Sequence, residues 1–91
     1  MKPKKVNNCG IYITKHPNFT GCLINKIVKN KAWYKEGKWH REDGPAVEWA
    51  DGFKAWYLNN IRYSEQDYKI AMRKIKLEIV LKRLDNENNT L

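Results

Sequence analysis

Four consecutive residues in the middle of the chain, His40 to Asp43, carry the side chains best suited to chemistry. The stretch around them reads GKWHREDGPAVEWADG, residues 37–52. An imidazole beside two carboxylates could supply a general base and metal ligands for hydrolysis. Gly44 and Pro45 follow at once, however, and close a tight turn in which adjacent side chains point in divergent directions. We therefore predict a charged turn, no catalytic residue and no enzymatic activity.

A metal site would have to use the two cysteines and two histidines. Cys9, His16, Cys22 and His40 are separated by six, five and seventeen residues, spacings that match no compact zinc motif. The sequence also shows no phosphate loop, dinucleotide fingerprint or nucleophile elbow. We predict no metal site and no cofactor. Reduced thiols are expected, because the N-terminus does not read as a secretory signal.

Lysines interleaved with aromatic residues precede the charged turn. Residues 26–41 read KIVKNKAWYKEGKWHR, in which lysines can neutralise phosphates and an exposed ring can stack on an unpaired base. Trp33 and Tyr34 point to opposite faces of a strand, so at most one is available, and we expect most other rings to pack within the sheet. The residues predicted to contact nucleic acid are Lys15, Lys26, Lys29, Lys31, Lys35, Lys38, Trp39, Arg41, Lys69, Arg73, Lys74 and Lys76.

Charge is distributed unevenly along the 91 residues, whose formal net charge is +8. Residues 1–41 hold ten lysines and arginines against the single acid Glu36, residues 42–67 are acidic, and residues 68–84 are basic again. A polarised basic protein typically meets nucleic acid, an acidic protein or an anionic surface. No apolar run reaches the ~20 residues of a membrane span. We expect a cytoplasmic protein with no membrane partner.

The first two-thirds of a single domain, residues 1–91, should form strands and turns. Residues 1–10 look like a flexible basic arm, because proline, asparagine and glycine interrupt them. Residues 11–63 predict antiparallel hairpins, with Asp51-Gly52 and Asn59-Asn60 as turns that accept positive φ. The expected strands are residues 11–14, 22–24 with 27–28, 31–35, 38–40, 45–50, 53–58 and 61–63.

The last third predicts one long helix, residues 64–85, followed by a tail at residues 86–91. Ser64 and Asp67 resemble a capping box at its start. Apolar residues at helical spacing should pack on the sheet, and surplus apolar surface could serve a homodimer. These residues are Tyr68, Met72, Ile75 and Ile79, widened by Leu77, Val80, Leu81 and Leu84. The predicted fold class is α+β, an antiparallel β-meander of repeated hairpins followed by one long C-terminal α-helix.

A repeat relates the two central hairpins. Lys-Ala-Trp-Tyr at residues 31–34 recurs at residues 54–57, a period of 23 residues. The stretch WYKEGKWHREDGPAVEWADGFKAWYLNN resembles repeats of phage and large-virus proteins, in which Trp-Tyr-x-x-Gly-x-x-His-Arg-Glu-Asp-Gly-Pro-Ala precedes an acidic-Gly turn and another Trp-Tyr. It also loosely resembles MORN repeats. The second copy departs from the pattern at residues 63–68, where Tyr-Ser-Glu-Gln-Asp-Tyr stands instead.

This resemblance covers residues 31–63 and implies stacked antiparallel hairpins and a phage origin, but no catalytic residues. Small basic phage proteins often act on host machinery, so it implies a host bacterial partner, such as a defence protein or a toxin endoribonuclease. Two functions stay open. One is contact with nucleic acid, RNA rather than DNA because no DNA-reading helix is evident, while inhibiting or redirecting that host protein. The other is direct inhibition of a host enzyme without nucleic acid.

Overall fold

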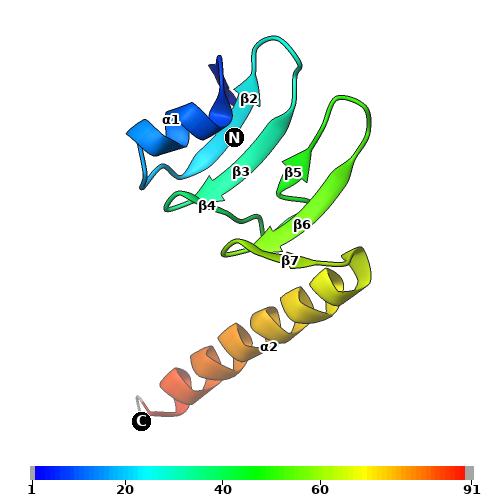
Figure 1. The fold of residues 1–91 in the computed structure, drawn as a ribbon. Coiled ribbons are helices and arrows are strands. Elements are labelled where there is room, and N and C mark those ends of the chain that lie inside the picture. Colours follow the sequence, from blue (N-terminus) through cyan, green and yellow to red (C-terminus); the bar gives the residue numbers. More distant parts are fainter. Residues whose placement is uncertain (1, 90–91) are drawn as a thin grey trace.

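Seven strands form one mixed sheet, and a long helix follows them along the chain (Figure 1). The computed structural model describes residues 2–89, with side chains for residues 2–84. The predicted α+β class with a C-terminal helix is confirmed. The elements in chain order are β1 (Lys4–Val6), α1 (Cys9–Lys15), β2 (Gly21–Asn25), β3 (Lys31–Lys35), β4 (Lys38–Trp39), β5 (Val47–Glu48), β6 (Lys54–Leu58), β7 (Ile61–Tyr63) and α2 (Glu65–Asn89).

The sheet is not the purely antiparallel meander that the sequence predicts. The strand order is β1-β2-β3-β5-β6-β7, and β1 pairs with β2 in parallel, with Lys4 opposite Leu23. The strands β4 and β5 share one edge of β3, because β4 pairs with Tyr34 and Lys35 and β5 pairs with the other end of β3. The prediction paired each strand with the next one in sequence in antiparallel fashion. It is wrong for β1, which pairs in parallel, and for β5, which pairs with β3 and not with β4.

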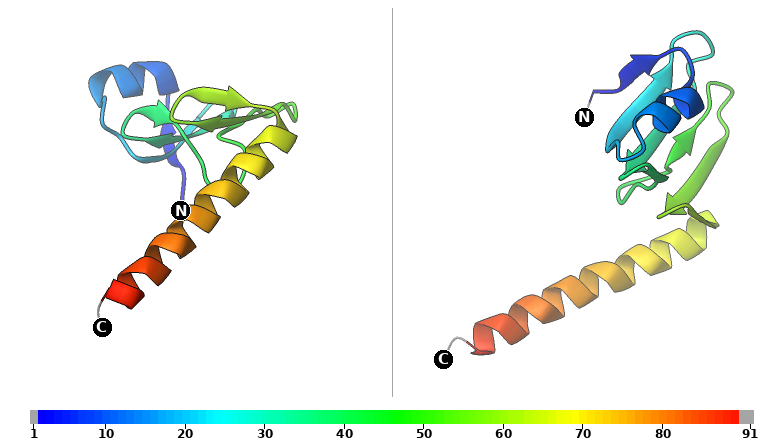
Figure 2. Two further views of the ribbon diagram at one scale, coloured as in Figure 1. Left: turned by 90° about the horizontal axis from the view of Figure 1, so that it is seen from below. Right: turned by 60° about the vertical axis from the view of Figure 1, so that its left-hand side comes forward.

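The two helices lie against opposite faces of the sheet (Figure 2). Buried residues of β2, β3, β5 and β6, among them Leu23 and Tyr34, point to one face, where Tyr12 and Ile13 of α1 pack against them. The first turns of α2 pack at the other end of the molecule, where Tyr68 and Met72 meet Leu58 of β6. Because α1 covers only the β1–β3 side, its face of the sheet stays open over β4 to β7 (Figure 1).

The N-terminal residues differ most from expectation. The predicted flexible arm at residues 1–10 is wrong for residues 4–10, which form β1 and begin α1. The predicted strand at residues 11–14 is also wrong. Asn8 caps a helix there, its Oδ1 accepting a hydrogen bond from the Ile11 N–H at 2.9 Å. Residues 27–28 form a turn instead of a strand, because both of their N–H groups donate to Asn25 Oδ1.

The hairpin turns follow the predicted chemistry with one exception. Glu36-Gly37 and Asn59-Asn60 have positive φ at both positions, as two-residue hairpin loops require. At Asp51-Gly52 only Gly52 has a positive φ, of 97°. The Gly52 N–H donates to the Trp49 carbonyl, and the Trp49 N–H donates to the Phe53 carbonyl. This is a three-residue loop ending in a glycine bulge, and not the predicted type I′ turn.

The helix α2 begins as predicted and runs further than predicted. Ser64 Oγ accepts a hydrogen bond from the Asp67 N–H at 3.1 Å. The helix continues to Asn89, so the predicted end at residue 85 and the predicted tail at residues 86–89 are wrong. Residues 90–91 of that tail lie outside the described residues. The last side chain packed against the sheet is Ile75, and residues 76–84 are all exposed. The projecting helix gives the molecule a long axis of 56 Å. Within residues 2–89, neither helix could cross a bilayer.

Candidate nucleic-acid interface

The charged turn at residues 40–43 joins the two halves of the sheet. The His40 N–H donates to the Trp33 carbonyl at 3.0 Å, and the Arg41 N–H donates to the Tyr57 carbonyl at 3.3 Å. Further along, the Trp33 N–H donates to the Ala46 carbonyl at 2.7 Å. The segment from residue 40 to 46 therefore fills the space between β3 and β6 that no strand occupies.

Arg41 is tied into this joint by its whole side chain. Its guanidinium lies 3.8 Å from the Trp33 ring centroid and donates to Asp43 Oδ1 at 2.8 Å, to the Pro45 carbonyl at 3.1 Å and to Glu48 Oε1 at 3.3 Å. Its carbonyl accepts the Tyr68 hydroxyl at 2.6 Å. Only 21% of the side chain is exposed. Arg41 is thus a structural cation. Lys35 and Lys69 also pair with carboxylates, Glu42 at 4.0 Å and Glu65 at 3.3 Å, but both of these pairs are exposed.

The remaining side chains of the turn bond to neighbours as well. His40 Nδ1 accepts the Asn59 N–H at 3.0 Å, which leaves the proton on Nε2, 2.7 Å from a Glu42 oxygen. This hydrogen bond from His40 holds the pKa of the Glu42 carboxyl below its ordinary value. The bond from Arg41 lowers the pKa of Asp43 in the same way. Residues 40–43 therefore form a hydrogen-bonded connection between the hairpins, in line with the charged turn that the sequence predicts.

The cysteines and histidines that were considered as metal ligands do not form a metal-binding cluster in the described residues. Among the described side chains, no group of three or more His, Cys, Asp or Glu residues is placed to hold a metal ion. Cys9 and Cys22 are free cysteines, and burial raises the pKa of both thiols. Both thiols are therefore protonated at neutral pH and are poor ligands and nucleophiles.

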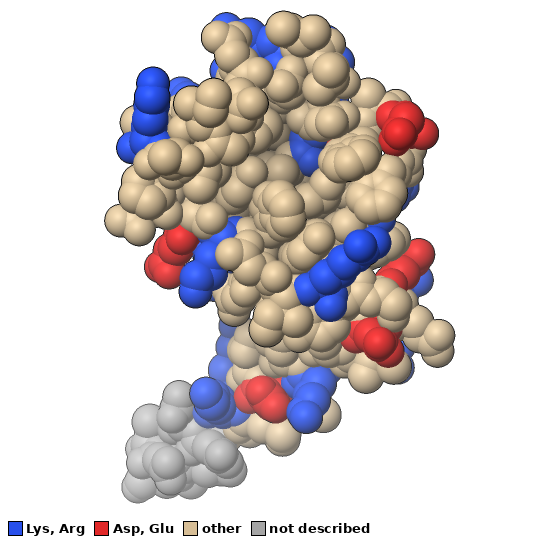
Figure 3. Space-filling model, in the orientation of Figure 1, with Lys and Arg blue, Asp and Glu red and all other residues tan. Residues whose placement is uncertain are grey.

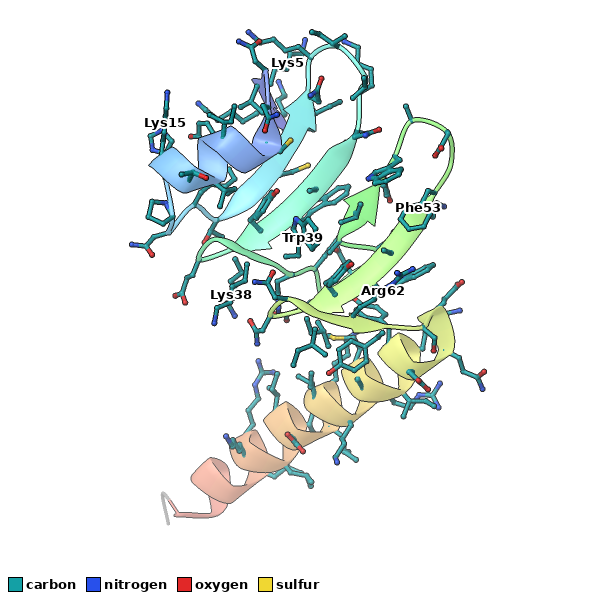
Figure 4. All side chains as sticks on the ribbon, in the orientation of Figure 1. Lys5, Lys15, Lys38, Trp39, Phe53 and Arg62 are labelled. Atoms are coloured by element: carbon teal, nitrogen blue, oxygen red, sulfur yellow. The ribbon has the colours of Figure 1, made fainter. Side chains whose placement is uncertain are left out.

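The open face of the sheet carries four aromatic side chains. Trp39 lies opposite Tyr34 and beside Tyr57, with ring centroids 4.9 Å apart. Trp49 and Phe53 flank the glycine bulge, also with centroids 4.9 Å apart. Trp39, Phe53 and Trp49 remain 38%, 41% and 48% exposed as whole residues. Trp39 and Phe53 lie over the same face in Figure 4. Three large rings on one uncovered sheet face form a surface on which flat ligands could stack.

Cations lie along the border of this aromatic face, which we define as Trp39, Trp49, Phe53 and Tyr57. Arg62 of β7 lies opposite Tyr57, and its guanidinium is 5.8 Å from the Phe53 ring centroid. Lys38 precedes Trp39 and is exposed. In Figure 3 the centre of this side of the molecule is mostly uncharged, and lysine and arginine lie around it together with several acidic residues. Figure 4 places Lys38 and Arg62 at the lower border.

The structure divides the predicted binding residues among several places. Lys38 and Trp39 belong to the aromatic face or its border. Lys69, Arg73 and Lys76 instead line a groove of about 610 Å³ between α2 and the turn at residues 42–45. The other predicted lysines are scattered. Lys15 is the last residue of α1, Lys26 and Lys29 lie in the β2–β3 loop, and Lys31 and Lys35 are the first and last residues of β3. Lys74 lies on the side of α2 that faces away from the groove.

Three residues of the candidate interface were not predicted from the sequence. One predicted contact, Arg41, is instead bonded within the fold. Trp49 was assigned to packing, and Phe53 and Arg62 were not considered. The predicted type I′ turn would have paired Trp49 with Lys54 and placed Trp49 on the face opposite Phe53. The glycine bulge instead brings Trp49 and Phe53 to the same face, and the expected turn gave no signal of this. The ring that the sequence left open to stacking is not available. Tyr34 is buried, and Arg41 covers Trp33.

Comparisons with protein-family models, with curated proteins and with solved structures give no match. The aromatic face and its surrounding charges are therefore the features from which a function can be proposed.

Proposed function

We propose that this protein binds single-stranded nucleic acid, RNA in the first place, on the aromatic face of its sheet. The observation that carries the proposal is the exposure of Trp39, Trp49 and Phe53 on one open face beside the cations Arg62 and Lys38. Unpaired bases stack on such rings, and each stacked base contributes about 1–3 kcal/mol. A duplex offers only its groove edges and phosphates, so the flat face suits unstacked bases better.

The phage resemblance extends this proposal to a host setting. In this setting, the protein binds RNA in the bacterial cytoplasm. It thereby inhibits or redirects a host protein that acts on the same RNA, such as a toxin or defence endoribonuclease. The net charge of +8 supports the RNA-binding step, since it speeds encounter with a polyanion.

Fluorescence anisotropy with a labelled oligouridylate of about 12 nucleotides tests the aromatic face. Replacing Phe53 or Trp49 by alanine should weaken binding about tenfold, because each change removes one stacking ring. Val80→Ala serves as the control, since Val80 is an exposed apolar residue of α2 and not of the sheet. Equal affinities for the wild type and both ring variants would exclude this face as the binding site.

Two matched arginine variants test whether the charge of Arg62 at the border of the aromatic face contributes to binding. Arg62→Gln and Arg83→Gln remove the same charge, one beside Phe53 and one on the projecting part of α2. Only Arg62→Gln should reduce the salt dependence of oligouridylate binding, by a slope of about 0.7 for one lost phosphate contact. If both variants change it alike, binding follows net charge and not this site.

Direct inhibition of a host protein without nucleic acid is the second candidate, and the groove beside α2 favours it. Its lining mixes the acids Glu42, Asp43 and Glu65 with basic residues and the apolar Trp56 and Met72. Carboxylates repel a polyanion, whereas a polypeptide segment can match both charges. Pull-down from bacterial lysate with and without RNase separates the two. A host partner lost on RNase treatment supports the RNA proposal, and a retained partner supports direct inhibition.

A further inference from the structure

The part of α2 that projects from the sheet carries an apolar stripe on the side opposite its docked face. Ile70, Leu77, Leu81 and Leu84 lie about 160–220° around the helix from the buried Tyr68. Their side chains are 50–58% exposed, and nothing in the described chain covers them. The sequence prediction merged Leu77, Leu81 and Leu84 with the docked residues into one wide face and did not include Ile70, but the helix separates the two sets onto opposed faces.

The spacing of this distal stripe is that of a coiled-coil seam. Residues 70, 77 and 84 are seven apart, and residue 81 lies four after 77, which gives the alternating steps of three and four that keep a seam on one side of a helix. Lys74 holds the remaining seam position. A single lysine in such a seam costs stability but fixes orientation and register.

We propose that two copies of this protein associate through the distal stripe as an antiparallel pair of α2 helices. A parallel pair would place the two Lys74 ammonium groups in one layer, whereas an antiparallel pair sets each against a leucine of the other copy. Self-pairing would also give the projecting part of α2 a packing partner, which it lacks among the described residues of a single copy. Residues 76–84 are all exposed, and an isolated segment of that length is marginally helical in water.

The antiparallel arrangement fits the rest of the molecule. Each projecting half would pack against the partner's half that is already anchored by Tyr68 and Met72. The two sheets would lie on the outer sides of the helix pair, because each sheet is docked on the face opposite the stripe (Figure 2). Neither sheet then obstructs the other copy. This pairing does not depend on nucleic-acid binding, since the aromatic face is on the sheet.

Sedimentation velocity of the full chain over a range of concentrations tests the pairing. The wild type should shift from monomer to dimer, and Leu77→Glu with Leu81→Glu should stay monomeric over the same range, at least tenfold weaker. Ile11→Glu with Ile27→Glu adds the same charges at exposed apolar sites elsewhere and should leave the dimer unchanged. Lys74→Leu should tighten the dimer at least tenfold, a gain of affinity that a misfolded variant would not give.

Orientation needs one more measurement. A spin label at Leu84→Cys, with Cys9 and Cys22 replaced by alanine, should give a label-to-label distance well beyond the roughly 10 Å between neighbouring helix axes. Close labels would overturn the antiparallel arrangement. A wild type that stays monomeric, or a dimer that the stripe variants leave intact, would overturn the pairing itself. Binding of a synthetic leucine-glutamate heptad peptide to a monomeric wild type would assign the stripe to an acidic helical partner instead.

Discussion

At the scale of single residues, Arg41 and Arg62 show why a basic residue cannot be assigned to phosphate from sequence. Both are arginines next to aromatic residues of a hairpin. Arg41 meets two carboxylates, a carbonyl and the Trp33 ring inside the fold, whereas Arg62 stands on the open face near Phe53. The carboxylate partners lie two and seven residues away from Arg41, so only the folded turn brings them together. Charge was predictable here, and its availability was not.

Arg41→Gln should destabilise the protein by about 2–3 kcal/mol. The change leaves Glu48 without its cation and uncovers Trp33, but the loss stays below the roughly 3–5 kcal/mol of a fully buried pair because the site is partly exposed. Arg62→Gln makes the same substitution at an exposed site and should cost less than about 0.5 kcal/mol. Urea denaturation of both variants measures the difference, and equal stabilities would show that the Arg41 network contributes little.

At the scale of elements, local patterns predicted the β3–β4, β5–β6 and β6–β7 hairpins but neither the pairing of β5 with β3 nor the N-terminal third. Strand pairing within a hairpin is set by its own turn, so Asn59-Asn60 sufficed to align β6 with β7. The strand β1 pairs with β2 across the intervening helix, and no local feature announces a parallel partner 19 residues away. Residues 11–14 have β-branched character, yet the Asn8 cap and packing of Tyr12 and Ile13 on the sheet override it.

The β3–β4 turn should tolerate no side chain at residue 37. Gly37 has a φ of 79°, and a Cβ there would lie 1.8 Å from the Pro17 carbonyl oxygen. Gly52 has a φ of 97° with nothing within 4 Å of the same position. Gly52→Ala should therefore cost only the backbone strain, about 1 kcal/mol. We expect Gly37→Ala to cost at least about 2 kcal/mol more, because backbone atoms must move.

Thermal and urea denaturation compare these two glycine variants directly. A Gly37→Ala protein no less stable than Gly52→Ala would mean that the segment around Pro17 moves aside freely. That segment is held to the turn by the Gly37 N–H, which donates to the Phe19 carbonyl at 2.9 Å, and by the Glu36 N–H, which donates to Thr20 Oγ1 at 2.9 Å.

At the scale of the whole molecule, the two proposed surfaces are separate. The aromatic face lies on the sheet, and the distal stripe lies on the helix that projects from the opposite side (Figure 2). A helical pattern alone predicted surplus apolar residues on α2. It could not tell which of them the sheet would cover, because that depends on where the chain enters the helix after β7.

Salt should act on the two surfaces in opposite directions. Nucleic-acid binding releases counterions and should weaken steeply between about 0.1 M and about 0.5 M salt. Pairing of α2 brings together residues 68–84 of two copies, a segment that holds six basic residues and one acid, so screening should strengthen the dimer. Anisotropy and sedimentation on the same samples provide the test. Parallel changes of both equilibria would show that one depends on the other.

The short strand β1 has a consequence for how copies of this protein meet in concentrated solution. It is the outermost strand on its side of the sheet, and its two exposed residues are Lys4 and Lys5. Lysines on an outer strand discourage another chain from adding to it, since a second strand would bring like charges together. Without these three residues, β2 would present a bare backbone edge with Cys22 and Leu23 beside it. We therefore expect the basic N-terminus to disfavour edge-to-edge association of copies at this side of the sheet, whatever the protein binds.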